Sequence, residues 1–212
     1  MSSLTIKNLN KIYNPGKNEV HAVKDFNLEI EDGEFVALLG PAGCGKTSTL
    51  RMIVGLESIT SGSILFDDVE INHLSPEQRN VAMAFESYAL YPNFTIFENL
   101  AFPLEVKKNS SSEISKKVGD IAEMLQITNI LELKPNQLSG GQQQRVSLGR
   151  ALIRDPAVFI LDEVMSHLDA HLKFQMLFEL KKIHRTLKKT MIYVTHDQME
   201  ALALSDRVAV MA

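Results

Sequence analysis

The sequence lacks several features that would assign it to whole classes of protein. It has no tryptophan and a single cysteine, Cys44, so no disulfide can form within its 212 residues. Its apolar runs, such as those at 35–39 and 157–161, reach five residues, whereas a membrane-spanning helix needs about 20. The start, Met-Ser-Ser-Leu-Thr-Ile-Lys, lacks the apolar centre of a secretory signal. We therefore expect a cytoplasmic chain that does not span a bilayer.

The sequence also has no excess of basic charge. Lys and Arg number 22 against 26 Asp and Glu, which gives a net charge of -4 and argues against a general nucleic-acid binder. An apolar fraction of 45% is ordinary for a globular protein and excludes a disordered or fibrous chain. The length suits one large domain, or one domain with a subdomain.

What is present is the pattern of an α/β protein with an insertion. Alternating or continuous apolar residues predict strands, and a spacing of three and four from Leu172 to Leu187 predicts an amphipathic helix. Strands are expected at 4–9, 20–30, 34–39, 63–66, 81–85, 158–161, 191–194 and 207–211. A helix is expected at 46–56, and helical periodicity runs from 86 to about 155. The α/β body is therefore interrupted by a helical insert of roughly 70 residues.

A glycine-rich loop lies between the expected buried strand and the expected helix. It fits the pattern G-x-x-x-x-G-K-[ST] through Gly40, Pro41, Ala42, Gly43, Cys44, Gly45, Lys46 and Thr47, with Ser48 next along the chain. Glycines let backbone N–H groups face phosphate oxygens, and the helix N-terminus adds positive potential. Lys46 is predicted to reach the β- and γ-phosphates, and Thr47 to offer its hydroxyl to Mg²⁺.

Two carboxylates follow another apolar strand. Asp162 comes directly after 158–161 and Glu163 comes next. The carboxyl end of a parallel strand lies beside the phosphate loop in such folds, so Asp162 is predicted to hold Mg²⁺ through its water shell. Glu163 is predicted to accept a proton from the water that attacks the γ-phosphate.

A second phosphate-binding element is expected about 90 residues beyond the first. Ser139 and Gln142 form a capping box around Gly140 and Gly141, and these glycines leave backbone N–H groups uncovered at the start of a helix. A helix N-terminus of this kind favours an anion.

The sequence Leu-Ser-Gly-Gly-Gln between a phosphate loop and Asp-Glu resembles the ATP-binding subunits of ABC transporters, and the resemblance covers the whole chain. Residues 166–169 resemble the family's D-loop, and 195–197 resemble its H-loop. Tyr13 lies where the family places an aromatic residue to stack on adenine. Residues 51–57 and 86–100 are similar to importers of sugars and related solutes, including the maltose-type ATPase.

The resemblance implies an α/β phosphate-loop NTPase fold of the ABC ATPase type. We expect a RecA-like core lobe at about 1–86 and 156–212, an N-terminal antiparallel β subdomain within it, and an α-helical subdomain at about 87–155. Importers of this subgroup often continue into a C-terminal regulatory domain of small barrels. That domain is absent from these 212 residues, so a truncated or short form is expected.

The resemblance further implies an ATPase that works as a head-to-tail homodimer or heterodimer, with ATP and Mg²⁺ as ligands. Lys46 of one subunit and residues Ser139, Gly141 and Gln142 of the other would enclose the γ-phosphate. His196 would contact that phosphate and organise the attacking water, and Asp169 would link the two sites.

The implied partners are integral membrane permease subunits, which would dock between Tyr88 and Phe97, and indirectly a solute-binding protein. No nucleic-acid partner is implied. The expected location is peripheral, on the cytoplasmic side of the cell membrane. A sugar or related small solute is favoured by the resemblance, and polyamines, iron and anions stay open.

Four residues depart from the family pattern. Ala42 replaces a common serine, Val164 a usual proline, His167 a usual asparagine, and Glu86 the glutamine of the Q-loop. At 4 Å two unit charges interact by about 4 kcal/mol at an effective dielectric of 20, so a carboxylate at 86 either ligates Mg²⁺ more strongly or repels the γ-phosphate.

Our hypothesis is that Glu86 slows turnover without abolishing ATP binding. Replacing Glu86 with Gln should therefore raise the steady-state ATPase rate, measured by phosphate release. A rate that does not change would contradict the hypothesis.

Other classes remain open on the sequence alone. A chromosome-maintenance or DNA-repair ATPase shares these motifs but carries a long coiled coil, whereas about 90 residues without sustained heptads separate Lys46 from Ser139. A translation-factor ATPase with two cassettes would need a second phosphate loop. A nucleotide-binding regulator without turnover is favoured only by Glu86.

Overall fold

The computed structural model describes residues 3–16, 18–85, 87–166 and 168–212. These fall into two compact units. The first comprises the residues up to 83, 157–162 and those from 184 onward, and the second comprises 84–156 and 163–183.

The first unit contains an antiparallel sheet of four strands in the order β2-β1-β4-β5. The strands are β1 (Leu4–Tyr13), β2 (Val20–Ile30), β4 (Ser61–Phe66) and β5 (Val69–Glu70). Along β1 Leu4 and Ile6 are buried with the period of two expected of a strand. The register shifts between Ile6 and Leu9, and Leu9 is buried three residues further on. The expected antiparallel β subdomain is therefore confirmed.

A second sheet has five strands in the order β6-β7-β8-β3-β9. They are β3 (Phe35–Leu39), β6 (Val81–Ala84), β7 (Val158–Asp162), β8 (Thr190–Thr195) and β9 (Arg207–Val210). β3 runs parallel to β8 and β9, and β8 runs parallel to β7. Continuous apolar runs in β3, β7 and β8 fit strands that are buried on both faces.

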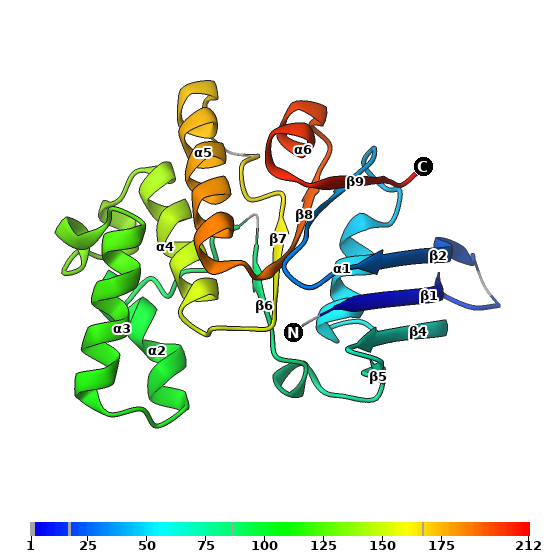
Figure 1. The fold of residues 1–212 in the computed structure, drawn as a ribbon, viewed down its shortest axis with the longest axis horizontal. Helices are drawn as coiled ribbons and strands as arrows, with labels where there is room; N and C mark the ends of the chain where they lie inside the picture. Colours follow the sequence, from blue (N-terminus) through cyan, green and yellow to red (C-terminus); the bar gives the residue numbers. More distant parts are fainter. Residues whose placement is uncertain (1–2, 17, 86, 167) are drawn as a thin grey trace. The chain divides into compact units, whose positions relative to one another are not determined.

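Two helices accompany these sheets. Helix α1 (Lys46–Val54) contacts both β2 and β7 (Figure 1), and α6 (Gln198–Leu204) contacts β3, β8 and β9. A short 3₁₀ turn, η1 (Pro76–Gln78), carries the capping box of Ser75 and Gln78. A capping box is typical of a helix start, and here the helical turn continues for only three residues.

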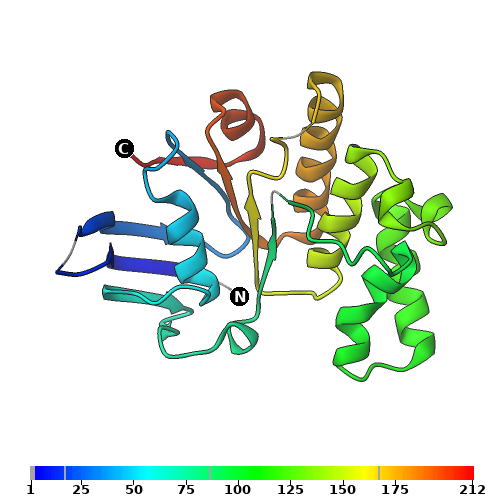
Figure 2. The same ribbon diagram turned by 180° about the vertical axis from the view of Figure 1, so that it is seen from behind.

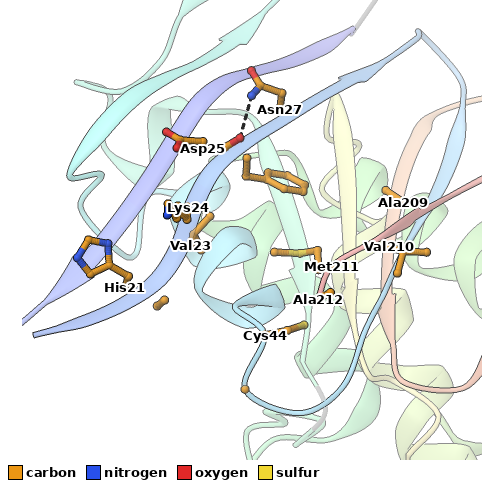
Figure 3. A pocket seen from close by; sticks show the side chains of 13 residues that line it. His21, Val23, Lys24, Asp25, Asn27, Cys44, Ala209, Val210, Met211 and Ala212 are labelled. Atoms are coloured by element: carbon orange, nitrogen blue, oxygen red, sulfur yellow. Dashed lines mark hydrogen bonds between the residues drawn. The ribbon is translucent and has the colours of Figure 1, made fainter.

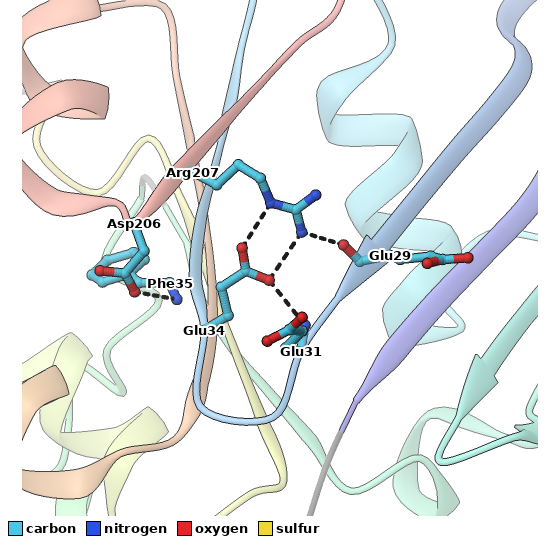
Figure 4. Close-up of polar contacts among 6 residues, drawn as sticks. All are labelled: Glu29, Glu31, Glu34, Phe35, Asp206 and Arg207. Atoms are coloured by element: carbon cyan, nitrogen blue, oxygen red, sulfur yellow. Dashed lines mark hydrogen bonds and ion pairs between the residues drawn. The ribbon is translucent and has the colours of Figure 1, made fainter.

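A charged cluster joins the ends of β2, β3 and β9 (Figure 4). Arg207 contacts both carboxylate oxygens of Glu34, at 2.7 and 2.9 Å, and also the carbonyl of Glu29. The N–H of Phe35 donates to Asp206 at 3.0 Å. Burial opposes ionisation of Glu34, but hydrogen bonds from Arg207 and from the Glu31 N–H outweigh it and hold the pKa of Glu34 below its ordinary value.

The C-terminus of α1 is held by a buried arginine. The guanidinium of Arg79, only 4% exposed, donates to the carbonyls of Met52 and Ile53 at 2.6 and 3.0 Å. It also donates to the carbonyls of Leu74 and Asn72, each at 3.0 Å. A cation at a helix C-terminus meets the negative end of the macrodipole and the carbonyls that lack partners within the helix. Arg79 therefore fixes the far end of the helix that begins at Lys46.

The second unit is helical (green to orange in Figures 1 and 2). It contains α2 (Ile96–Val106), α3 (Ser111–Met124), α4 (Gly140–Leu152) and most of α5 (Ala170–Leu187), with 3₁₀ turns η2 (Thr128–Ile130) and η3 (Pro135–Gln137). α2, α3 and α4 contact one another. Capping boxes at Thr95, Ser110 and Ser139 begin these three helices.

Two details differ from the sequence pattern. Helical periodicity suggests a helix from 86, but α2 begins only at Ile96, because Thr95 caps it and residues 87–95 form turns and irregular chain. Residues 163–183 group with the helical unit, whereas the sequence places 156–212 in the core lobe. Within the unit, Arg145 of α4 pairs with Glu179 of α5 at 2.9 Å.

No helix among the residues that the structure describes is long and apolar enough to cross a membrane.

Arg79→Met should lower the free energy of unfolding by about 2–4 kcal/mol, because buried carbonyls lose their donors. Arg51→Met is the matched control. Arg51 is exposed in the last turn of α1, the helix that Arg79 holds, and its replacement should change the free energy of unfolding by less than about 1 kcal/mol. Urea denaturation followed by circular dichroism measures both values. Equal effects of the two substitutions would contradict the role of Arg79.

Candidate functional site

Three segments leave the five-stranded sheet at the same edge. Leu39, the last residue of β3, pairs with Thr195, the last residue of β8. Asp162, the last residue of β7, pairs with Val194. Because these strands are parallel, the phosphate loop, His196 and Asp162 all lie at the carboxyl edge of one sheet. Ligands bind at this edge in open α/β folds.

The phosphate loop lies against two backbone segments of the first unit. A Cβ at Gly45, whose φ is +98°, would come within 2.1 Å of the carbonyl oxygen of Ala22. A Cβ at Gly40 would come within 2.3 Å of the carbonyl oxygen of Met211. Side chains cannot be accommodated at these distances, so glycine at both positions allows the loop to take this path.

Lys46 is nearly buried under the loop that it follows. Its Nζ donates to the carbonyls of Gly40 at 2.7 Å and Pro41 at 2.8 Å, and lies 3.8 Å from the Sγ of Cys44. A buried ammonium is tolerated because carbonyl oxygens surround it. The positive charge is thus held inside the turn of the loop.

The start of α1 suits an anion. Gly45 caps the helix without any side-chain bond to its first N–H groups, and these groups favour phosphate oxygens. Thr47 is exposed in the first turn, whereas Ser48 is half-buried, and Ala42 and Gly43 are exposed at the tip of the loop.

The donors available for a cation are oxygens. Among the described residues, no group of three or more His, Cys, Asp or Glu side chains is gathered as a metal cage. Mg²⁺ is usually bound by one or two protein oxygens together with substrate phosphates and water. The Thr47 hydroxyl and the Asp162 carboxylate, both in the first unit, fit this donor set.

Tyr13, at the end of β1, is connected to α1. Its hydroxyl lies 3.1 Å from the Oγ of Ser48. The Nζ of Lys11 lies 4.8 Å from the centre of its ring and is fixed by the carbonyl of Ser58 at 2.6 Å and by Glu57 at 3.1 Å. A cation over the ring adds an attraction of about 0.5–2 kcal/mol. Tyr13 is thus held beside the helix that carries Lys46 and Thr47.

A cavity of about 660 Å³ adjoins the phosphate loop at Gly43 and Cys44 (Figure 3). It is lined by Gly43 and Cys44, by residues 21–27 of β2 and by residues 209–212. Figure 3 draws the Cys44 side chain at its wall. Lys46, Thr47 and Asp162 do not line it.

The helix start that the sequence predicts as a second phosphate-binding element lies in the helical unit. Ser139 caps α4: its Oγ accepts from the N–H of Gln142 at 3.3 Å, and its own N–H donates to the Oε1 of Gln142 at 2.9 Å. In the first turn Gly140 is exposed, whereas Gly141 is buried. A Cβ at Gly141 would meet Leu172 of α5 at 2.9 Å. The expected capping box is therefore confirmed.

Glu163 and Asp169 also belong to the helical unit. Glu163 has a φ of +47°, unusual for a non-glycine residue, and its carbonyl accepts from the Ser166 N–H at 3.1 Å. Asp169 accepts from the N–H groups of His171 and Leu172, each at 3.0 Å, so it caps α5. Val164 is buried. Glu86 and His167 lie outside the described residues.

The segment between Tyr88 and Phe97 is partly exposed. Tyr91 is 37% exposed, whereas Ile96 is fully buried. Buried Asn99 accepts from the Tyr91 N–H at 2.8 Å and donates to the Tyr91 carbonyl at 3.1 Å. The guanidinium of Arg150, at the end of α4, lies 4.3 Å from the ring centre of Tyr91.

Sequence patterns did not identify Lys11, Asn99 or Arg150 as residues that hold Tyr13 and Tyr91 in place. The available signal was a polar or charged residue inside an otherwise apolar stretch, as with Asn99 in Ile-Phe-Glu-Asn-Leu-Ala and Arg150 in Val-Ser-Leu-Gly-Arg-Ala-Leu. Asn99 is buried and Arg150 is half-buried, and polar groups withdrawn from water are retained with hydrogen-bond partners.

Together, the strand–loop–helix at 35–54 and the parallel sheet define an α/β protein of the phosphate-loop type, with a helical unit that carries a second glycine-containing helix start. A family model described as ABC transporter matches residues 23–166. The chain belongs to the ABC transporter family.

Among relatives, the sn-glycerol-3-phosphate import ATP-binding protein UgpC of Psychromonas ingrahamii is 49% identical over 211 residues, covering 100% of this chain and 56% of the relative. The maltose/maltodextrin import ATP-binding protein MalK of Photorhabdus laumondii is 47% identical over the same length, again covering 100% and 56%. The chain thus spans little more than half the length of these curated relatives.

A solved structure titled as the dimeric structure of MJ0796, a bacterial ABC transporter cassette, superimposes with a TM-score of 0.86 at 33% identity, over 98% of this chain and 94% of that one. A dimeric post-hydrolysis state of the same cassette, bound to ADP and Pi, gives a TM-score of 0.85 at 33% identity, with the same coverage. The expected ABC ATPase fold is confirmed.

Proposed function

We propose that this chain is the ATP-binding and ATP-hydrolysing cassette of an importer for a sugar or related small solute. The observation that carries the proposal is the shared sheet edge, where the phosphate loop, Asp162 and His196 come together. Two relatives are named as ATP-binding proteins for the import of sn-glycerol 3-phosphate and of maltose or maltodextrin, and these names support the class of transporter.

Nucleotide binding would use the first unit. The N–H groups at the start of α1 and the ammonium of Lys46 would meet the phosphates, so the lysine would exchange part of its contact with the Gly40 and Pro41 carbonyls for phosphate oxygens. Tyr13, held by Ser48 and Lys11, would present its ring to adenine. Thr47 and Asp162 would hold Mg²⁺, which would neutralise charge on the β- and γ-phosphates.

Hydrolysis would use Glu163 and His196. Glu163 directly follows Asp162 and would accept the proton of the attacking water as the bond from the γ-phosphorus to the bridging oxygen breaks, giving ADP and phosphate. His196, exposed at the end of β8, would orient the water and contact the γ-phosphate.

A second copy of an ATPase subunit would complete each site. The first turn of α4, with Ser139, Gly140, Gly141 and Gln142, offers N–H groups without acidic side chains nearby in that turn, which suits a γ-phosphate. Asp169, at the start of α5, would connect the two sites. The dimeric state in the titles of the structural relatives supports this assembly.

Permease subunits would dock on the segment between Tyr88 and Phe97. The exposed side of Tyr91 with Pro92 and Asn93 supports this surface, and Arg150 connects it to the helix that begins at Gly140. The chain would then act on the cytoplasmic side of the membrane through these partners. A solute-binding protein would be engaged indirectly.

Glu163→Gln should trap ATP-bound dimers, because the nucleotide stays bound when no base accepts the proton of water. Size-exclusion chromatography with light scattering should give a dimer with Mg²⁺ and ATP and a monomer without nucleotide. Glu123→Gln, an exposed glutamate on α3, is the control and should behave as wild type. Only monomers of Glu163→Gln at saturating ATP would count against the assigned base.

A further inference from the structure

The residues before and after His196 both form hydrogen bonds that hold its turn. β8 ends at Thr195 and α6 begins at Gln198, so His196 and Asp197 form the connection. Asp197 caps α6: its Oδ1 accepts from the N–H groups of Met199 at 2.8 Å and Glu200 at 3.3 Å. His196 is exposed, whereas the strand before it is buried along its whole length.

Beneath this turn lies a buried carboxylate to which the proposed mechanism gives no role. Glu200 is 4% exposed, and its Oε2 accepts from the hydroxyls of Tyr193 and Thr195, both at 2.5 Å. A buried charge is tolerated only with such partners, and hydrogen bonds to a charged group are roughly twice as strong as neutral ones. Burial of Tyr193, together with the charge of Glu200, raises the pKa of the Tyr193 hydroxyl, so it stays a donor.

The Thr195 hydroxyl connects this carboxylate to the backbone on the far side of His196. It donates to Glu200 and accepts from the Asp197 N–H at 3.0 Å. Residues before and after His196 are therefore joined through one side chain, and that side chain is joined to the first turn of α6. β8 itself is fixed on both sides, by β3 and β7.

We propose that Glu200 is a positioning residue for His196, because it ties the end of β8 to the start of α6 and thereby fixes the turn at the phosphate edge of the sheet. This inference rests on the proposed role of His196 at the γ-phosphate. Without the charge of the carboxylate, the two buried hydroxyls donate to a weaker acceptor and the turn is held less firmly. A misplacement of about 1 Å in a catalytic group can lower a rate by as much as 10²-fold.

The test is a double-mutant cycle on steady-state ATP hydrolysis by the full chain, with Glu200→Gln, His196→Ala and the double variant. Gln keeps the shape of the side chain but is neutral, and its amide needs a buried acceptor of its own. We expect Glu200→Gln alone to lower kcat by about tenfold, with KM for ATP within about twofold of wild type. In the His196→Ala background the same change should alter the remaining rate by less than about twofold, since coupled residues are not additive.

Two further variants keep the test decisive. Leu202→Gln, 71% exposed on the same helix, is the control and should leave kcat within about twofold. Tyr193→Phe removes one donor and keeps the carboxylate, so it serves if Glu200→Gln fails to fold. It should lower kcat by a smaller factor, and again only when His196 is present.

The outcomes separate this inference from the proposed function. An equal fractional loss of kcat from Glu200→Gln with and without His196, or no loss in either, would overturn the positioning role and leave the proposed ATPase intact. A wild-type chain without ATPase activity, or a kcat unaffected by His196→Ala, would overturn the proposed role of His196 and this inference with it.

Discussion

The close packing of the phosphate loop against the backbone of β2 and of the segment after β9 is the constraint on which the rest of the site depends. Gly45 passes the carbonyl of Ala22 in β2, and Gly40 passes the carbonyl of Met211 after β9, with no room for a Cβ at either position. These two contacts bring the antiparallel sheet and the parallel sheet of the first unit to the same loop. Lys46 then lies inside the turn, on the carbonyls of Gly40 and Pro41. A cation is thus placed where phosphates would bind, before any ligand contributes.

Buried polar side chains fix the elements around that loop. Arg79 holds the C-terminus of α1, Lys11 holds Tyr13 beside its N-terminal turn, and Glu200 holds the turn after β8. In the helical unit, Asn99 and Arg150 do the same for the segment that begins at Tyr88. Each of these groups supports an element that carries a proposed contact and is itself directed at protein atoms. The chain thus separates groups that would touch the nucleotide from groups that hold them in place, as precise sites require.

Much of the fold was predictable from the sequence, because strand and helix periods are local. The buried runs of β3, β7 and β8, the capping boxes at Ser139 and Ser75, and the loop from Gly40 to Thr47 are each contained in a few consecutive residues. What the sequence could not supply depends on contacts between distant segments. The pairing of Leu39 with Thr195, the burial of Glu200 and the late start of α2 at Ile96 follow from strand order and packing. Tyr13 needed its contact with Ser48, 35 residues away, before its place beside α1 was evident. The roles of Glu86 and His167 rest on the sequence alone.

The central claim is that the phosphate loop of this chain binds ATP through Lys46. Isothermal titration calorimetry with ATP and Mg²⁺ on the wild-type chain and on Lys46→Ala tests it most directly, with thermal melting to establish that the variant is folded. The account predicts saturable binding by the wild-type chain and an affinity at least about tenfold weaker in the folded variant, since a buried charge-assisted contact is lost. Equal affinities of the two proteins, or no binding by the wild type, would contradict it.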